Sequence, residues 1–200
     1  MSYRSKSLDS FNTRQRFFIF DCVLNGKKTF TEEEFIQFNI SEELVKLFTA
    51  EYYQLEGNGR LVSHDSPLAI NQIYSAMNVL VEENRILLKT IEQRYFKEIF
   101  VREFPENIYK HLMAAEKCFY CGITKEDIKE LANHGKLYKK NERGWSFEID
   151  RKKANLEYTE DNCVTACYWC NNAKTDEFDD IEFKPIGILI GKTLKARLQY

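Results

Sequence analysis

Four of the six cysteines in this 200-residue chain form two pairs with the same spacing, Cys118 with Cys121 and Cys167 with Cys170. A Cys-x-x-Cys pair can turn both of its thiolates toward one ion, and two such pairs supply the four sulfur ligands of a tetrahedral zinc site. Gly122 follows the first pair, as is usual where such a pair makes a tight turn. The spacing therefore predicts one structural Zn²⁺ bound by these four cysteines.

The remaining cysteines, Cys22 and Cys163, lie in or beside apolar segments, and we expect both to be small buried hydrophobic residues. The first ten residues are polar and contain no secretory signal, and no apolar run approaches the length of a membrane-spanning helix. The sequence thus predicts a cytoplasmic protein with no membrane partner. In a reducing compartment, cysteines are ligands more often than disulfides.

Three polar residues stand at positions where they can form a second site. Asp150 ends the strand-like stretch that begins at Phe147, Asn162 lies in the connection that follows, and Asn171 comes directly after the second cysteine pair. This arrangement resembles the HNH (ββα-metal) endonucleases, and among them the endonuclease VII-like enzymes that carry a four-cysteine structural zinc. The resemblance covers roughly residues 115–180 and does not extend to the first hundred residues.

The resemblance implies a β-hairpin followed by a helix that starts at Asn171. It also implies that Asp150 and Asn171 bind a catalytic divalent metal and that Asn162 holds the hairpin in shape. Oxygen ligands of this kind suit Mg²⁺ or Mn²⁺. Together with Arg151, these residues form the predicted catalytic set of a metal-dependent endonuclease that hydrolyses phosphodiester bonds in DNA.

One position departs from the family pattern. The residue after Asp150 is normally the His that acts as general base, and here it is Arg151, whose guanidinium stays protonated and cannot accept a proton. Three alternatives remain open. His111 or His134 reaches the site, Lys153 assists in the loop, or metal and phosphate activate the water while Arg151 clamps the scissile phosphate.

The overall charge does not predict a nucleic-acid-binding protein, because the formal net charge is −2 and the pI is about 6.0. Basic residues nevertheless gather beside the predicted metal site. They are Lys136, Lys139, Lys140, Arg143, Arg151, Lys152 and Lys153, set against Glu142, Glu148 and Asp150. A phosphate backbone would lie along this stretch, and a solvated hairpin loop is the alternative interpretation.

The elements that must position these residues predict an α+β fold. A largely helical region, residues 1–110, is expected to select substrate or pair two chains. Its helix-start signals are Thr31 with Glu34, Ser41, and Ser66-Pro67. Apolar positions from residue 70 to 96 follow helical spacing and indicate one long helix or two.

Residues 111–200 are predicted to form the HNH domain and a closing helix. Thr124 and Asp127 are expected to cap a helix that ends near His134. The acidic segment 176–180 is interpreted as a helix-breaking linker. The last helix is predicted over Pro185–Leu198, with an inward apolar face made of Ile186, Ile188, Leu189, Ile190 and Leu194.

Three functions from different classes are compatible with these patterns. The leading one is a DNA endonuclease with a restriction, phage-defence or junction-resolving role, for which a homodimer or a defence-system partner protein is a candidate because cutting both strands needs two active sites. The second is a zinc-stabilised nucleic-acid-binding module that lost catalysis when Arg151 replaced the base. The third is a protein-interaction domain in which zinc and hairpin are only a scaffold.

Overall fold

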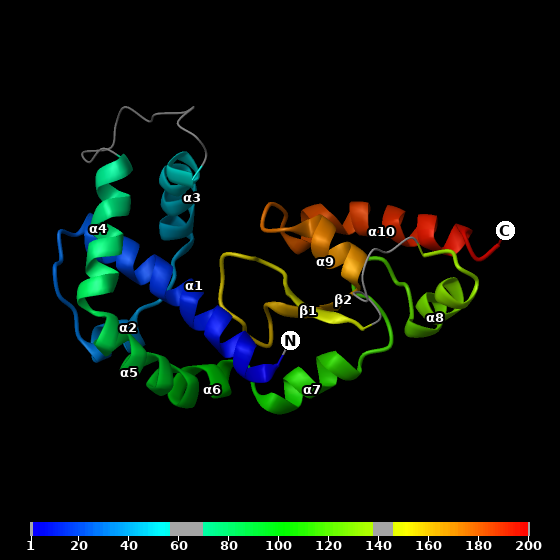
Figure 1. Ribbon diagram of the computed structural model, residues 1–200, viewed down its shortest axis with the longest axis horizontal. Helices are drawn as coiled ribbons and strands as arrows, with labels where there is room; N and C mark the ends of the chain where they lie inside the picture. Colours follow the sequence, from blue (N-terminus) through cyan, green and yellow to red (C-terminus); the bar gives the residue numbers. More distant parts are fainter. Residues whose placement is uncertain (1, 57–69, 138–145, 200) are drawn as a thin grey trace. The chain divides into compact units, whose positions relative to one another are not determined.

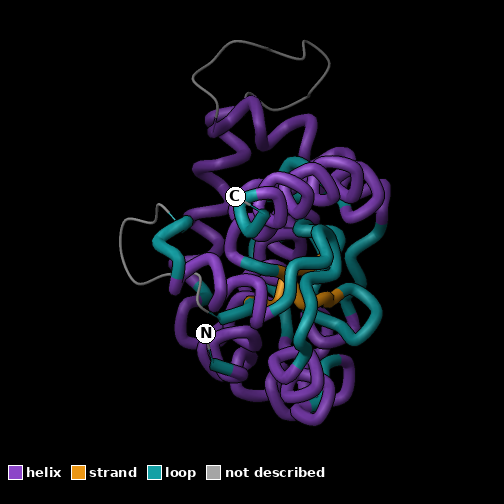
Figure 2. Tube along the Cα trace, turned by 90° about the vertical axis from the view of Figure 1, so that its right-hand side faces the viewer, coloured by secondary structure: helices purple, strands orange, loops and turns teal. Residues whose placement is uncertain are grey.

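Helices account for most of the described residues, as Figure 2 shows for the computed structural model, and strand is confined among these residues to one short pair. The structure describes residues 2–56, 70–137 and 146–199. The predicted α+β class is confirmed at this level. Within the described ranges, no helix combines the length and the apolar character that crossing a membrane requires.

The chain divides into two compact units. The N-terminal unit consists of residues 7–102, and the C-terminal unit consists of residues 103–200 together with residues 1–6. The sequence had placed this boundary after residue 110. The first helix, α1 (Tyr3–Leu24), contributes its first residues to the C-terminal unit and its remainder to the N-terminal unit.

The N-terminal unit is helical and has an aromatic core. Besides α1 it contains α2 (Glu32–Gln37), α3 (Glu42–Glu56), α4 (Ile70–Glu83), α5 (Arg85–Tyr95), the π-helical turn η1 (Phe96–Phe100) and part of α6 (Val101–Glu103). Phe18 packs edge-to-face against Phe30 and Phe35, with ring centroids 5.0 Å apart in each pair. The apolar run within residues 14–24 belongs to helix α1, and its aromatic residues build the core.

The helix-start signals of this unit are confirmed where the structure describes them. Glu34 N–H donates to the Thr31 hydroxyl, and Thr31 N–H donates to the Glu34 carboxylate, at 3.2 and 2.8 Å. Ser41 accepts from Leu44 N–H at 3.1 Å. The signal at Ser66-Pro67 lies outside the described residues. Residues 70–96 form two helices, which Asn84 separates.

The C-terminal unit combines helices with one antiparallel hairpin. Its elements are α7 (Glu106–Ala114), α8 (Lys125–Asn133), β1 (Glu148–Arg151), β2 (Cys163–Ala166), α9 (Tyr168–Lys174) and α10 (Asp180–Ala196). The register pairs Glu148 with Ala166 and Asp150 with Val164. In Figure 1, α9 lies beside the two strands, and it contacts β1. The predicted Thr124–Asp127 capping box begins α8, and Gly135 follows its end at φ +64°.

The start of α10 corrects one prediction. Asp179 accepts hydrogen bonds from Ile181 N–H and Glu182 N–H at 2.9 and 2.8 Å, and Glu182 completes a capping box. The helix therefore begins at Asp180, and the interpretation of residues 176–180 as a helix-breaking linker is wrong for its last two residues. Acidic side chains at a helix start satisfy the free N–H groups and complement the helix dipole.

The buried face of α10 also differs from the predicted one. Ile186, Ile188 and Leu189 are 38%, 43% and 62% exposed, whereas Leu194 is buried and Ile190 is partly buried, as expected. The face that packs inward carries Phe183, Gly187, Gly191 and Leu194. A Cβ on Gly191 would lie 2.2 Å from the Cys121 carbonyl oxygen. The helix backbone thus packs directly on the first cysteine pair, which side-chain hydrophobicity does not reveal.

This contact predicts that Gly191→Ala destabilises the C-terminal unit by about 1–3 kcal/mol, because the methyl group clashes with backbone that cannot move aside. Urea unfolding followed by tryptophan fluorescence measures the effect. Lys192→Ala, at an exposed neighbouring position of the same helix, is the matched control and should change stability little. Equal stability of the two variants would show that α10 does not pack this closely.

Candidate metal centre and neighbouring active site

The four paired cysteines converge on one point. The Sγ atoms of Cys118, Cys121, Cys167 and Cys170 all lie within 4.8 Å of one another, and those of Cys121 and Cys167 are 3.6 Å apart. Zinc–sulfur bonds of about 2.3 Å in a tetrahedron place the sulfurs about 3.8 Å apart. The cluster therefore fits a metal ion such as Zn²⁺. Four protein ligands leave no open position on such an ion, so its role would be structural.

Local backbone geometry explains how each pair is presented. In the first pair, Gly122 N–H donates to the Cys118 carbonyl at 3.0 Å, and Gly122 adopts φ +70°, a conformation that glycine adopts without strain. In the second pair, Cys167 is the N-cap of α9 and its carbonyl accepts from Asn171 N–H. The helix thus starts at Tyr168, three residues before the predicted start at Asn171.

Backbone donors and neighbouring thiols favour the thiolate form of Cys118 in this cluster. Cys167 N–H points at the Cys118 sulfur at 3.3 Å, and Ile123 N–H points at the Cys121 sulfur at 3.5 Å. Hydrogen bonds from Cys121 and the other two thiols hold the pKa of Cys118 below its ordinary value. A deprotonated sulfur is the form that binds a metal.

The two remaining cysteines behave as predicted. Cys22 and Cys163 are buried, and desolvation raises their pKa values to about 11 and about 12. Both therefore stay as neutral thiols at neutral pH, and neither belongs to the metal cluster.

The second predicted site lies between β1 and α9. Glu148 and Asp150 alternate along β1 and so share one face, and Asn171 and Lys174 are separated by about one turn of α9. Asn171 donates from Nδ2 to Glu148 Oε2 at 2.5 Å, and Lys174 Nζ lies 3.5 Å from Asp150 Oδ2. The structure therefore brings the predicted metal ligands Asp150 and Asn171 onto facing surfaces of two elements in contact.

One oxygen of Asp150 is fully engaged. Oδ2 accepts a hydrogen bond from the Tyr120 hydroxyl at 2.6 Å in addition to the contact with Lys174. Burial raises the pKa of Asp150, while the Tyr120 hydrogen bond and the Lys174 charge act in the opposite direction. Among the described residues, no partner contacts Oδ1. The carboxylate is thus fixed through one oxygen and offers the other to an ion.

Asn162 makes the loop-holding hydrogen bonds expected of it. Its Oδ1 accepts from Lys153 N–H at 2.9 Å, and its Nδ2 donates to the carbonyls of Lys153 and Glu157 at 3.1 and 2.9 Å. Both ends of the amide therefore bind the backbone that connects β1 to β2. This bonding pattern fixes the loop and leaves Asn162 in a positioning role.

Arg151 points to the opposite face of β1 from Asp150. Its Nη1 donates to the Leu156 carbonyl at 3.0 Å, and its guanidinium carbon lies 4.9 Å from the centre of the Tyr158 ring. Lys6, on α1, also contacts Tyr158 and donates to the carbonyl of Ile149 at 3.1 Å. Contact between Arg151 and a phosphate stays a prediction.

The structure does not bring a histidine to the site through any described contact. His134 follows α8 and its ring Nδ1 interacts with the Glu130 carbonyl at 2.8 Å, and His111 is exposed on α7. Within the described residues, neither ring is hydrogen-bonded to Asp150 or Asn171. The side chain of Lys153 is exposed. Of the basic stretch, Lys139, Lys140 and Arg143 lie outside the described residues.

Sequence reasoning missed the side chains that orient the site, namely Tyr120, Glu148, Lys174 and Lys6. The sequence did contain a signal for Glu148 and Lys174. Glu148 precedes Asp150 by two residues on a strand, and Lys174 follows Asn171 by three residues on a helix, so each shares a face with a residue that was predicted. Tyr120 lies inside the first cysteine pair and Lys6 far away in sequence, and neither spacing predicts their contacts.

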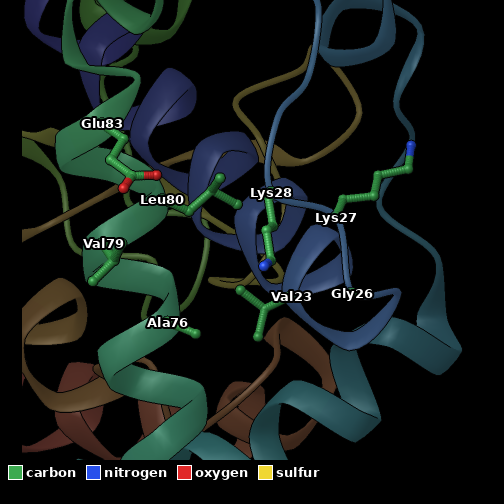
Figure 3. A pocket seen from close by; sticks show the side chains of 8 residues that line it. All are labelled: Val23, Gly26, Lys27, Lys28, Ala76, Val79, Leu80 and Glu83. Atoms are coloured by element: carbon green, nitrogen blue, oxygen red, sulfur yellow. The ribbon is translucent and has the colours of Figure 1, made fainter.

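A separate hollow of about 390 Å³ lies in the N-terminal unit. Figure 3 shows its lining, which is mostly aliphatic and comes from the end of α1, the residues that follow it, and α4: Val23, Gly26, Lys27, Lys28, Ala76, Val79, Leu80 and Glu83. Lys27 points away from the hollow and pairs with Glu34 at 2.9 Å. These described lining residues include no cysteine, histidine or hydroxyl group.

Comparisons with known proteins add no family to this picture. No protein-family model matches the chain, and neither a curated protein nor a solved structure matches it.

The metal centre predicts one zinc per chain, with all four ligands being sulfur. Cys170→Ser should lose the zinc and unfold the C-terminal unit, because binding energy at such a centre is also folding energy. Metal analysis by mass spectrometry and circular dichroism measure both effects. Cys163→Ser, which changes a buried cysteine outside the cluster, should keep the zinc. Full-length protein purified without chelator and free of zinc would contradict the assignment.

The ion pair between α9 and β1 predicts a measurable coupling. Lys174 is fully buried and Asp150 is 12% exposed, so Lys174→Met should destabilise the C-terminal unit by about 3 kcal/mol by leaving a buried carboxylate without its cation. The double variant Asp150→Asn with Lys174→Met should recover part of that loss. Strictly additive losses in denaturant unfolding would show that the two side chains do not interact.

Proposed function

We propose that the protein is a metal-dependent endonuclease of the HNH type that hydrolyses phosphodiester bonds in DNA. The observation that supports this proposal best is that Asp150 on β1 contacts α9, the helix that carries Cys170 and, directly after it, Asn171. The order of elements, hairpin then helix, agrees with the ββα unit that the resemblance implies. The proposal adds an activity to the α+β fold and the metal-binding cysteines described above.

Oxygen atoms of two residues would hold the catalytic ion. Asp150 Oδ1 and Asn171 Oδ1 both lack a partner among the described residues, since Asp150 is engaged through Oδ2 and Asn171 through Nδ2. A carboxylate and an amide oxygen suit Mg²⁺ or Mn²⁺, which keep further positions for water and phosphate. Such an ion polarises the phosphate and stabilises the leaving oxygen.

The residues of the chain have separate tasks in this proposal. Tyr120 and Lys174 orient the Asp150 carboxylate, and Glu148 orients the Asn171 amide. Asn162 fixes the loop that follows β1. The cysteine cluster holds the first cysteine pair, β2 and α9 together. It takes no part in the reaction, because four sulfur ligands leave no open position on the bound ion.

A second candidate function is a zinc-stabilised DNA-binding module without catalysis. The position of Arg151 favours it, because its contacts to Leu156 and Tyr158 give it a role in holding the loop rather than in proton transfer. Loss of a general base lowers rates by about 10²–10⁴-fold. We therefore expect a slow endonuclease. If the reaction is absent altogether, the protein is a binding module.

Plasmid nicking by the zinc-loaded protein in Mg²⁺ or Mn²⁺ tests the proposal. Asp150→Ala should lower the rate by about 10²–10³-fold, the usual effect of removing one group that stabilises the transition state. Asp176→Ala, which removes an exposed carboxylate just after α9, is the control and should retain the rate of the unmodified protein.

Two other results would assign the second and third functions. Salt-dependent DNA binding without cleavage, with zinc retained, would identify a binding module, because binding through phosphates weakens as salt rises. Neither cleavage nor binding would leave the zinc-stabilised unit as a scaffold for protein contacts. Cleavage that Asp150→Ala leaves unchanged would indicate a contaminating nuclease.

A further inference from the structure

A second cavity, of about 350 Å³, adjoins the proposed active site and lies entirely within the C-terminal unit. Its lining combines apolar and polar groups from α1, α7, β1 and α9: Lys6, Met113, Ser146, Phe147, Glu148, Ile149 and Asn171. Asn171 and Glu148 belong both to this cavity and to the site between β1 and α9. A ligand that fills the cavity therefore lies next to the groups proposed to act on a phosphate.

The cavity is lined in part by Glu148 and Ile149 of β1, and among the described residues no strand lies beside the edge of β1 that faces away from β2. Lys152 N–H donates to the Asn162 carbonyl at 2.7 Å, so even-numbered residues of β1 bond to β2, and the peptide groups of odd-numbered residues point to the other edge. Two buried lysines donate to that edge, Lys6 to the Ile149 carbonyl and Lys174 to the Arg151 carbonyl. Lys6 also lines the cavity.

Phe147 presents an unsatisfied peptide group at the same edge. By the alternation along β1, its N–H and C=O point away from β2, and neither makes a hydrogen bond with any described residue. Phe147 is only 2% exposed, so water reaches these groups poorly. Buried peptide groups are usually hydrogen-bonded, so a ligand with polar edges would find a donor and an acceptor at this position.

The chemistry of the lining matches a flat heteroaromatic ring with polar edges. Met113 and Ile149 supply apolar surface, while Ser146 supplies a hydroxyl group beside the Phe147 peptide. The volume is at the lower end of that of small-ligand sites, about 300–1,000 Å³, so it suits one ring system and not a duplex. A nucleobase enters such a pocket after it leaves its stack, and the pocket then reads its edge by hydrogen bonds.

We propose that this cavity holds one unstacked nucleobase of the cleaved strand, next to the scissile phosphate. This inference rests on the proposed endonuclease function and names the part of the substrate that the same site recognises. Glu148 Oε1 has no partner among the described residues and accepts hydrogen bonds only. Guanine presents a ring N–H beside an amino group, so guanine is the base that this carboxylate favours.

The test begins with the unmodified protein and labelled single-stranded oligonucleotides that carry an abasic residue at each position around the cut. Loss of the base that fills the cavity should lower kcat/KM by about 5- to 100-fold at one position only, in line with the loss of base contacts. Replacing guanine at that position by thymine should lower it less. Glu148→Gln should abolish the difference between guanine and thymine.

Filling the cavity provides an independent variant. Met113→Trp should lower kcat/KM on the intact oligonucleotide by a similar factor and should cause no further loss on the abasic one, because both changes remove the same contact. Lys110→Trp, at an exposed position of the same helix, is the matched control and should behave like the unmodified protein. Zinc content and circular dichroism confirm that each variant is folded.

The outcomes distinguish failure of the base-binding cavity from failure of the proposed endonuclease function. Cleavage that depends on Asp150 but shows no abasic effect at any position would overturn the base-binding cavity and leave the endonuclease standing. If the reductions in kcat/KM caused by the abasic residue and by Met113→Trp multiply when they are combined, the base-binding cavity would be overturned as well, since the two changes would then act at different places. No cleavage of any substrate would overturn both.

Discussion

The convergence of four sulfur atoms is the constraint on which the C-terminal unit depends. Cys118 and Cys121 lie on a tight turn, Cys167 and Cys170 at the start of α9, and α10 packs its glycine face against the first pair. These segments also surround a buried hydrophobic cluster that includes Tyr120, Phe147 and Phe183. A metal ion bound by the four cysteines would add folding energy to this small core.

Two buried lysines lie against one edge of strand β1. Within the part of the chain that the structure describes, β1 pairs only with β2, and the carbonyls on its other edge accept hydrogen bonds from the buried ammonium groups of Lys6 on α1 and Lys174 on α9. An open strand edge exposes unsatisfied peptide groups, and covering it with lysines prevents pairing with another chain. The lysine from α9 also compensates the charge of Asp150. One set of contacts thus protects the strand edge and orients the carboxylate of the proposed site.

Local sequence signals predicted much of this arrangement and failed where backbone packing or contacts between distant residues decide the structure. Capping residues such as Thr31 and Thr124 located helix starts, because their hydrogen bonds form within one turn. The cysteine spacing predicted the metal cluster because each pair supplies two sulfurs and one tetrahedral ion takes four. The inward face of α10 was predicted wrongly, since glycine carries no hydrophobic signal although it permits the closest packing. The contact of Tyr120 with Asp150 spans 30 residues, and no periodicity encodes it.

The membership of α1 in both units has a consequence for the order in which the chain folds during synthesis. Residues 7–102 emerge from the ribosome early and can form their aromatic core as soon as they are free. Lys6 must wait for Ile149 and Tyr158, which are 143 and 152 residues further along the chain. The C-terminal unit therefore closes only after Tyr158 has been made. A bulky group attached beside Lys6 would interfere with this late step while leaving the aromatic core of the N-terminal unit intact.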